Sequence, residues 1–223
     1  MSTLDTRRHM ELFNADLFDT PIHVIGAGAT GSWLVLQLAK LGIKGELINV
    51  WDFDIVEGHN VPNQAFGKLD VGELKVLALK EQIEDQTGAV IKANIGKYEN
   101  QRLAGYVFLM VDSMAERKRI WDESIKMKQA IKLLIEPRMG LDVGRVYNVQ
   151  PANLDHVEKY EACFYSDEEA EVSACGTSMT VITSALGIAS TCVRQLINNE
   201  AEVELDNEIL LDFMYNNLIA TKW

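Results

Sequence analysis

Short apolar runs alternate with segments of helical periodicity along the first 140 residues of the chain. The short runs are rich in β-branched residues, which is typical of buried strands, and they lie at residues 21–25, 46–51, 89–95, 106–111 and 131–135. Between them, apolar residues recur every three or four positions after residue 31 and over 71–86 and 114–127, which predicts amphipathic helices. This alternation predicts a mostly parallel sheet with flanking helices.

The pattern changes beyond residue 140. Residues 143–149 resemble an antiparallel strand, 177–197 form a long apolar segment of helical spacing, and 202–213 predict a hairpin or an edge strand. We therefore predict an α/β fold, a Rossmann-like and mostly parallel sheet with flanking helices and a few antiparallel C-terminal strands. We interpret residues 1–223 as one domain, in which a helical arm (1–20) precedes a nucleotide-binding half (21–140) and a sheet extension with a C-terminal helix (141–223).

A glycine-rich segment, Gly26-Ala27-Gly28-Ala29-Thr30-Gly31, joins the first predicted strand to the first predicted helix. In such a turn the first glycine permits the bend, the second lets phosphates approach the backbone, and the third lets the helix pack closely. This context predicts a nucleotide site, and the alternative is a glycine-rich turn that binds nothing. Asp52 ends the second strand, where a dinucleotide enzyme has its ribose-binding acid, so an NAD-dependent oxidoreductase remains an alternative.

The amino-acid composition and the net charge bear on which kinds of partner the protein can bind. Hydrophobic residues make up 48% of the chain and charged residues 24%, as in soluble globular proteins. The formal net charge of -12 repels a phosphate backbone over most of the surface, so we expect no nucleic-acid partner, and a bound nucleotide must be held by local backbone N–H groups, a lysine or a metal ion. No run of about eighteen apolar residues and no signal-peptide pattern occurs, so we expect no membrane association and a cytoplasmic protein.

The segment that follows the second strand has no role in a hydride-transfer site. It contains Asp52-Phe53-Asp54-Ile55-Val56-Glu57-Gly58-His59-Asn60, then Pro62-Asn63-Gln64 and Gly72-Glu73-Leu74-Lys75, with Asp112 and Arg117 later in the chain. In order and spacing these residues resemble the ThiF/MoeB/HesA family, bacterial relatives of ubiquitin-activating enzymes. In that family the glycine loop is followed by DxDxVxxSNLNRQ, by a GxxK helix, and by an Asp ahead of a helix with a nearby Arg. The resemblance extends from about residue 22 to residue 196.

The resemblance implies an enzyme that uses ATP to adenylate a carboxylate, namely the C-terminal Gly-Gly tail of a small ubiquitin-like or sulfur-carrier protein. It implies that Asp52 holds the ribose, that Lys75 reaches the phosphates and that Asp112 orients Mg²⁺. The other nucleotide-binding residues that it implies are Gly26, Gly28, Gly31, Asp54, Asn60 and Gln64. Adenylation puts negative charge on the phosphoryl groups, which cations must neutralise, whereas the carboxylate needs no general base.

The chain departs from the family pattern at residues that bear on catalysis. Asn63 stands where the family has the arginine of its NRQ triplet, so one phosphate-binding cation is missing. Family members place an arginine near the N-terminus that can cross a dimer interface, which makes Arg8 or Arg7 a candidate replacement in an expected homodimer; the alternative is a pair of solvated charges. Cys175 precedes the last predicted helix, in a place similar to a cysteine that several family members use for thioester or persulfide chemistry. An unreactive, buried thiol is the alternative.

Two further features concern metal and substrate. The three cysteines, Cys163, Cys175 and Cys192, cannot form the two CxxC pairs of the zinc site that many relatives carry, so we expect no zinc. Arg138 follows the strand at 131–135, where α/β sheets place ligands, and is either a substrate contact or part of a surface turn. Loss of the loop arginine leaves a further hypothesis open, in which the chain is a catalytically impaired, nucleotide-binding partner of an active relative.

Overall fold

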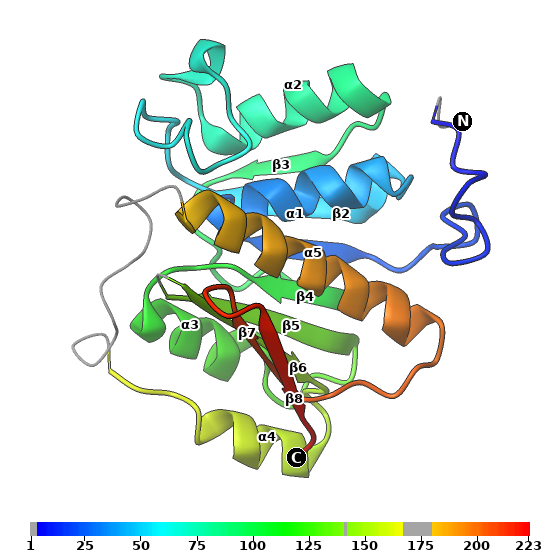
Figure 1. Cartoon of the computed structure of the whole chain (residues 1–223), viewed down its shortest axis with the longest axis vertical. Helices are drawn as coiled ribbons and strands as arrows, with labels where there is room; N and C mark the ends of the chain where they lie inside the picture. The colour runs from blue at the N-terminus through cyan, green and yellow to red at the C-terminus, as the bar shows by residue number, and fades with distance from the viewer. Residues whose placement is uncertain (1–3, 141, 167–179) are drawn as a thin grey trace.

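The computed structural model of the chain describes residues 4–140, 142–166 and 180–223. These residues form one sheet of eight strands in the order β3-β2-β1-β4-β5-β6-β7-β8 (Figure 1). The strands are β1 (Ile22–Ile25), β2 (Ile48–Asp52), β3 (Lys92–Ile95), β4 (Gly105–Leu109), β5 (Ile131–Met139), β6 (Val143–Val149), β7 (Glu208–Asp212) and β8 (Asn217–Thr221). The helices are α1 (Ala29–Lys40), α2 (Lys75–Thr87), α3 (Met114–Ile120), α4 (Leu154–Glu161) and α5 (Thr180–Glu200).

Strand pairing divides the sheet into two halves. The strands from β3 to β5 are parallel to their neighbours, and those from β5 to β8 pair antiparallel. β1 lies between β2 and β4, so the connections that follow it run first to one side of the sheet and then to the other. This is the Rossmann arrangement. The predicted fold class, including the antiparallel C-terminal strands, is confirmed.

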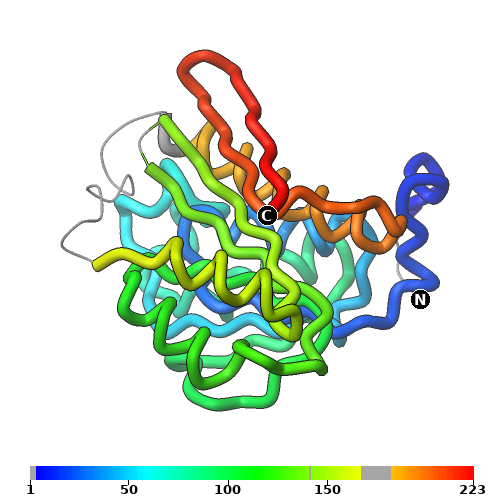
Figure 2. Tube along the Cα trace, turned by 90° about the horizontal axis from the view of Figure 1, so that it is seen from below, coloured from blue at the N-terminus to red at the C-terminus, as the bar shows by residue number. Residues whose placement is uncertain are grey.

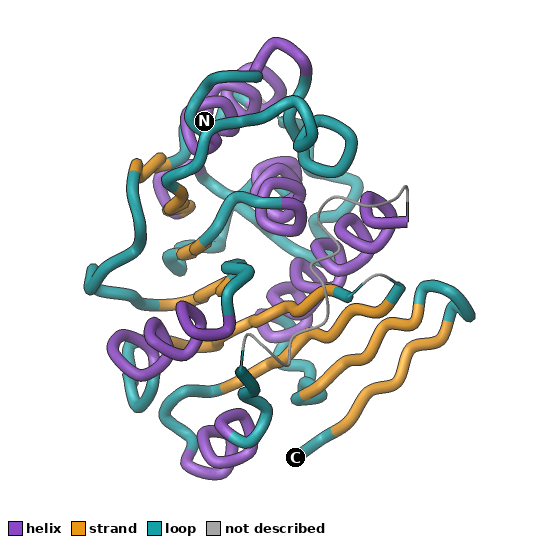
Figure 3. Tube along the Cα trace, turned by 90° about the vertical axis from the view of Figure 1, so that its left-hand side faces the viewer, coloured by secondary structure: helices purple, strands orange, loops and turns teal. Residues whose placement is uncertain are grey.

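Helices cover both faces of the sheet (Figure 3). Each face has its own apolar core. The helices α1, α2 and α5 contribute Leu34, Ile83 and Leu196 to one core. The chain around α3 and α4 contributes Trp121 and Tyr160 to the other. The central strands lie between these two layers, which explains why their sequences are apolar runs rather than alternating patterns. None of the described helices combines the length and the apolar character that crossing a membrane requires.

β5 extends further than the apolar run at 131–135 predicts. We expect a strand that ends at Glu136-Pro137, yet β5 continues to Met139. Proline is tolerated at position 137 because parallel pairing with β4 stops at Ile135, so only β6 flanks the strand beyond that point. The extension keeps Arg138 in the sheet, opposite Arg145 of β6.

The helix predicted at 114–127 is α-helical only to Ile120 and is followed by a π-helical turn over Trp121–Ile125. Other differences lie in polar or exposed segments. α4 is not predicted, because it is short and buries only Val157 and Tyr160. The segment 202–213, expected to be a hairpin or an edge strand, contains β7, the first strand of the β7–β8 hairpin that projects from the body of the molecule in Figure 2. The second strand of the hairpin is exposed along its whole length, although it contains Leu218 and Ile219. The helical arm expected at residues 1–20 is, over its described residues 4–20, a series of turns.

His23 is a buried titratable residue in the middle of β1. Its ring stacks on Trp51 with the ring centroids 5.4 Å apart, and its Nδ1 has no hydrogen-bond partner among the described residues. Burial, and then the charge on Lys92, lower the pKa of His23 from the ordinary value of 6.5 to about 4. The folded protein therefore keeps this imidazole neutral under conditions in which the unfolded chain protonates it.

Substitution of His23 by Phe should remove part of the pH dependence of stability. The unfolded chain takes up the proton as the pH falls through 6.5 and the folded chain only near pH 4, so the wild type should lose about 3 kcal/mol of unfolding free energy over that interval. Urea unfolding at pH 7, 6, 5 and 4.5 should show a shallower loss for His23→Phe than for the wild type. His59→Gln, at an exposed site, should keep the wild-type slope. Equal slopes in all three proteins would contradict the assignment to His23.

Candidate functional site

A cleft of about 1060 Å³ opens at the C-terminal ends of the parallel strands. It lies where the connections from β1 and β4 diverge, which is the place where open α/β sheets bind ligands. Ligand pockets usually have volumes of about 300–1,000 Å³, so this cleft is large enough for a nucleotide together with part of a second substrate. Of the residues named from the sequence, those that line the cleft are Gly26, Gly28, Asp52, Asp54, Asn60, Gln64, Lys75, Asp112, Arg117 and Arg138.

The glycine loop turns tightly against the end of β4. Gly26 has a φ of 103°, and a Cβ atom at this position would lie 2.8 Å from the carbonyl oxygen of Met110. A Cβ atom on Gly31 would lie 2.1 Å from the carbonyl oxygen of Gly26. A Cβ atom on Gly28 would meet nothing within 4 Å, because Gly28 borders the open cleft. The first and third glycines therefore shape the turn, and the second leaves room for a ligand beside the backbone.

The N-terminus of α1 faces the cleft, and no acidic or capping side chain neutralises the positive end of the helix dipole. Gly28 is the N-cap residue, no side chain caps the helix, and its first turn contains no acidic residue. Ala29 and Thr30 of the first turn line the cleft. Free N–H groups and the positive end of the helix dipole favour an anion at such a place. The loop and helix together fit a phosphate group.

Asp52 ties the glycine loop to the end of β2. Its Oδ2 accepts the N–H of Ala27 at 2.6 Å and its Oδ1 accepts the N–H of Asp54 at 2.8 Å. Burial raises the pKa of Asp52, while these two hydrogen bonds and the charge of Lys75 oppose the rise. Each carboxylate oxygen has a second lone pair, so Asp52 can hold the loop and also accept a hydroxyl from a ligand such as a ribose.

Lys75 begins α2 with its side chain buried and its ammonium group at the cleft. Its Nζ donates to Oδ2 of Asp54 at 2.9 Å, and its backbone N–H donates to the carbonyl oxygen of Asp54 at 2.9 Å. The side chain of Asp54 is 48% exposed, so solvent screens this ion pair. Asp54 thus orients the ammonium group without sealing it off from a phosphate.

Asp112 follows β4, on the other side of the glycine loop. It is exposed, lines the cleft, and makes no hydrogen bond or ion pair with the described residues. Mg²⁺ at phosphate sites is usually bound by one or two carboxylates together with phosphate oxygens and waters, so a free carboxylate here fits a metal that arrives with a nucleotide. No group of three His, Cys, Asp or Glu side chains that could hold a metal ion occurs in the part of the chain that the structure describes. A metal here would depend on the oxygens of the ligand.

Asn60 and Gln64 lie in a hydrogen-bonded turn beside the cleft. The Oδ1 of Asn60 accepts the N–H of Glu57 at 2.8 Å, and its carbonyl oxygen accepts the N–H of Gln64 at 2.9 Å. The Oε1 of Gln64 is buried and has no partner among the described residues. Asn63, in the place of the expected arginine, is also buried and does not line the cleft; its carbonyl oxygen accepts the indole N–H of Trp33 at 3.2 Å. This position supplies no charge to the site.

One of the candidate catalytic residues, Arg8, does not join this group. Arg8 is exposed in the N-terminal arm, which packs near the C-terminal end of α1, where Nε2 of His9 lies 3.1 Å from the carbonyl oxygen of Leu41. The glycine loop is at the other end of that helix, so Arg8 does not line the cleft of its own chain. Cys175 lies outside the described residues.

The cleft also contains a lysine that the sequence did not single out. Lys97 follows β3, and its Nζ lies 5.1 Å from the centroid of the Phe53 ring, with both side chains lining the cleft. A cation over an aromatic face is weakly attracted to it, which holds the long side chain near the cleft. No motif surrounds Lys97, so no sequence signal marks it.

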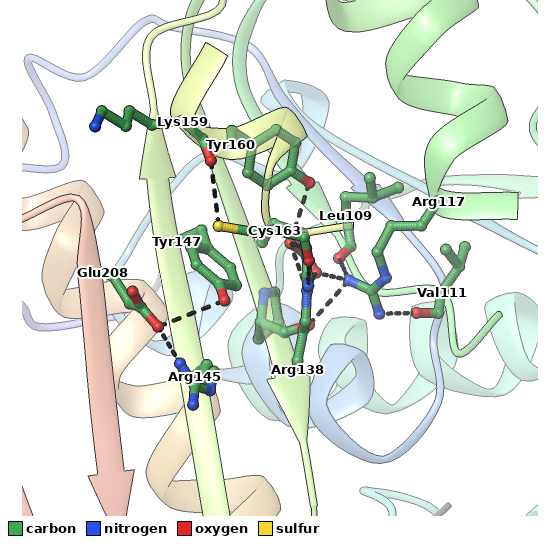
Figure 4. Close-up of polar contacts among 12 residues, drawn as sticks. Leu109, Val111, Arg117, Arg138, Arg145, Tyr147, Lys159, Tyr160, Cys163 and Glu208 are labelled. Atoms are coloured by element: carbon green, nitrogen blue, oxygen red, sulfur yellow. Dashed lines mark hydrogen bonds and ion pairs between the residues drawn. The ribbon is translucent and has the colours of Figure 1, made fainter. Parts of the chain in front are cut away.

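Two buried arginines share one buried carboxylate at the end of β5 (Figure 4). Nη1 of Arg117 donates to Oε1 of Glu136, and Nη2 of Arg138 donates to Oε2 at 3.0 Å. The hydroxyl of Tyr160 donates to the same Oε2 at 3.0 Å. Burial, and then the charge of Glu136, raise the pKa of Tyr160 well above its ordinary value, so the hydroxyl stays protonated. Arg138 is buried in β5, and its interpretation as part of a surface turn is therefore wrong.

The model of the ThiF family matches residues 7–212 of the chain. No curated protein matches the sequence at a significant level. Among solved structures, E. coli MccB with AMPCPP and MccA has a TM-score of 0.64 at 16% identity, over 92% of this chain and 64% of MccB. E. coli MccB with ATP has a TM-score of 0.68 at 17% identity, over 95% and 66%. PaaA has a TM-score of 0.70 at 17% identity, over 97% of this chain and 80% of PaaA.

At these identities the structural likeness establishes a shared fold. The chain spans 64% of the length of MccB in the first of these comparisons, so about a third of MccB has no counterpart in this sequence. The family match covers the glycine loop, the segment from Asp52 to Lys75, and Asp112. The residues that line the cleft therefore lie within the region that defines the family.

Substitution of the loop glycines should separate folding from ligand binding. Gly31→Ala should lower the unfolding free energy by about 1–3 kcal/mol, because the added methyl group meets the carbonyl of Gly26. Gly28→Ala is the matched control: it should leave the urea midpoint nearly unchanged and weaken the thermal stabilisation by MgATP, because its methyl group enters the cleft. Wild-type behaviour of both variants would contradict the geometry described for the loop.

Proposed function

The chain belongs to the ThiF family, and on that premise we propose that it uses MgATP to adenylate a carboxylate, giving an acyl adenylate and pyrophosphate. The observation that carries the proposal is that the glycine loop, Asp52, Lys75 and Asp112 all border one cleft at the ends of the parallel strands. Family membership also favours ATP over the NAD considered from the sequence.

The reaction requires little covalent chemistry from the protein. An oxygen of the substrate carboxylate attacks the α-phosphorus of ATP and forms a new P–O bond. The bond from the α-phosphorus to the oxygen that bridges to the β-phosphorus breaks, and its electron pair leaves with pyrophosphate. No proton has to be removed, because a carboxylate is ionised at neutral pH. The protein therefore has to position the two reactants and neutralise charge on the phosphoryl groups.

Each task has a candidate group in the cleft. The loop backbone and the N-terminus of α1 hold phosphate oxygens, and Lys75 adds a charge that Asp54 keeps in position. Asp52 accepts a ribose hydroxyl beside its two backbone hydrogen bonds. Asp112 holds Mg²⁺, which supplies positive charge to the phosphates when bound.

The substrate that we propose is the C-terminal tail of a small protein, ending in Gly-Gly. The family resemblance supports it, and E. coli MccB, which shares the fold, has been crystallised with MccA. We further propose a homodimer in which Arg8 reaches the cleft of the neighbouring copy. In its own chain Arg8 lies toward the far end of α1, so only a second copy could bring it to a cleft.

One observation favours a second candidate function. Asn63 is buried, uncharged and absent from the lining of the cleft, so the position of the family arginine contributes nothing to phosphate binding. A chain that bound MgATP without adenylating any carboxylate would be a nucleotide-binding partner of an active relative. The two functions differ in one measurable property, the exchange of pyrophosphate into ATP.

Exchange of labelled pyrophosphate into ATP should depend on a free carboxylate. We expect exchange with synthetic peptides that end in Gly-Gly and none with the same peptides as C-terminal amides. Lys75→Met and Asp112→Asn should each lower the exchange rate by about 100-fold or more, since each removes a group that stabilises charge in the transition state. Lys68→Met removes an exposed lysine outside the cleft and should keep the wild-type rate.

The outcomes distinguish the candidate functions. Thermal stabilisation by MgATP without exchange for any free-acid peptide would favour the nucleotide-binding partner. Stabilisation by NAD and not by MgATP would contradict both functions. Wild-type exchange in Lys75→Met would remove Lys75 from the proposed mechanism.

A further inference from the structure

We propose that Arg138 is a specificity-determining residue that binds the carboxylate group of the substrate to be adenylated. The inference rests on the proposed function and adds the place where the second reactant is held. It starts from Arg117, Glu136 and Arg138, which we call the arginine triad. Figure 4 shows both arginines of the triad meeting at the end of β5.

The arginine triad contains two positive charges and one negative charge, so its net charge is +1. Glu136 is fully buried, and it is the only carboxylate among the described residues that pairs with either arginine. Arg117 and Arg138 are 5% and 9% exposed, and the neighbouring Tyr160 is neutral. A buried charge costs free energy unless an opposite charge or hydrogen bonds compensate it. The triad therefore favours an anion that comes from outside the described chain.

Arg117 makes its hydrogen bonds to the protein itself, and one hydrogen on its Nη2 has no acceptor among the described residues. Besides Glu136, it donates to the carbonyl oxygens of Leu109, Val111 and Pro137. Its Nε has no partner among the described residues, but this atom is shielded from solvent and cannot meet a ligand in the cleft. The contacts of Arg117 thus fix the end of β5 against α3. The net positive charge of the triad is available to a ligand through Arg138.

Arg138 keeps hydrogen-bonding capacity. Its Nε and Nη2 donate to Glu136 at 3.0–3.1 Å, and its Nη1 donates to the carbonyl oxygen of Cys163 at 2.6 Å. Of the five N–H hydrogens of the guanidinium group, one on Nη1 and one on Nη2 have no acceptor among the described residues. The rings of Tyr147 and Phe164 lie 4.6 and 5.6 Å from its Cζ, which keeps the planar group in one orientation. A held guanidinium with two free donors suits a carboxylate.

The position of Arg138 in the sheet separates it from the groups assigned to the nucleotide. Along the C-terminal edge of the sheet, the cleft-lining residues follow the strand order as Lys97, Asp52, Gly26, Asp112 and Arg138. If the ribose binds at the end of β2 and the phosphates over the loop after β1, as proposed above, the side of β4 and β5 is left for the carboxylate nucleophile. Arg138 is the buried cation at the end of β5 on that side, and two of its N–H hydrogens have no acceptor among the described residues.

Binding of a carboxylate probe tests this assignment. Isothermal titration calorimetry in the presence of Mg²⁺ and AMPCPP, in which the bond that breaks is blocked, should detect the tripeptide Ala-Gly-Gly and not its C-terminal amide. Arg138→Met should weaken tripeptide binding by about 10-fold or more, because a charge-assisted hydrogen bond is lost, and should leave the affinity for AMPCPP unchanged. Folding should survive, since Glu136 keeps Arg117 as its partner.

Arg145→Met is the matched control. Arg145 lies opposite Arg138 in the β5–β6 register, but it pairs with Glu208 of β7 and does not line the cleft. Arg145→Met changes the net charge by the same amount as Arg138→Met and should alter neither the tripeptide affinity nor the AMPCPP affinity. Should Arg138→Met fail to fold, Arg138→Lys keeps the charge, loses the planar fork, and should show a smaller loss of tripeptide affinity.

The remaining outcomes each decide a separate point. Wild-type tripeptide affinity in Arg138→Met, or equal affinity of the wild type for the free acid and the amide, overturns the inference. The inference is also overturned if Arg138→Met loses affinity for AMPCPP and keeps its affinity for the tripeptide, because Arg138 would then bind a phosphate group. If the wild-type protein binds no AMPCPP, the proposed function is refuted. The role of Arg138 is then still decided by titrating the free-acid tripeptide and its amide without AMPCPP.

Discussion

The carboxylate of Asp52 accepts one N–H from the glycine loop, at Ala27, and one from the segment that follows β2, at Asp54. The N–H of Gly26 donates to the carbonyl oxygen of Trp51 at 2.9 Å, so the loop is bound to the end of β2 by both backbone and side chain. Hydrogen bonds to an ionised group typically contribute about 1.5–3 kcal/mol. They fix the direction in which α1 leaves the loop and, through Asp54, the position of Lys75. The part of the cleft that we propose for the phosphates therefore depends on Asp52, for which the family resemblance implies a contact with the ribose.

A chain with a formal net charge of -12 has to attract anionic reactants locally. The cleft does so with positive groups that are held in different ways. The ammonium group of Lys75 is kept by a half-exposed carboxylate, the end of α1 has no capping acid, and two buried arginines outnumber the carboxylate between them. In each case the protein leaves part of the positive charge uncompensated toward the cleft, which is where negative charge would increase during the proposed adenylation.

The parallel half of the fold and many of the residues that line the cleft could be predicted because they depend on short sequence segments. The glycine loop, Asp52 and Lys75 belong to one continuous motif, and the buried strands are apolar runs. The arginine triad could not be predicted, since it joins Arg117 to Glu136 from another element and closes with Tyr160 of α4. The sequence predicts too early an end for β5 because proline cannot donate to a strand ladder. The structure shows that Pro137 is tolerated, since β4 no longer pairs with β5 beyond Ile135.

β5 is paired with a parallel strand on one edge and an antiparallel strand on the other. It is thus a boundary shared by two structural units, a nucleotide unit toward β3 and an outer unit toward β8. In such a layout, changes in the outer strands can reshape what is presented to Arg138 while the register that supports the glycine loop stays intact. Under the proposed function, substitutions in the outer strands could therefore change which carboxylate the protein accepts, while the groups proposed to bind ATP stay in place.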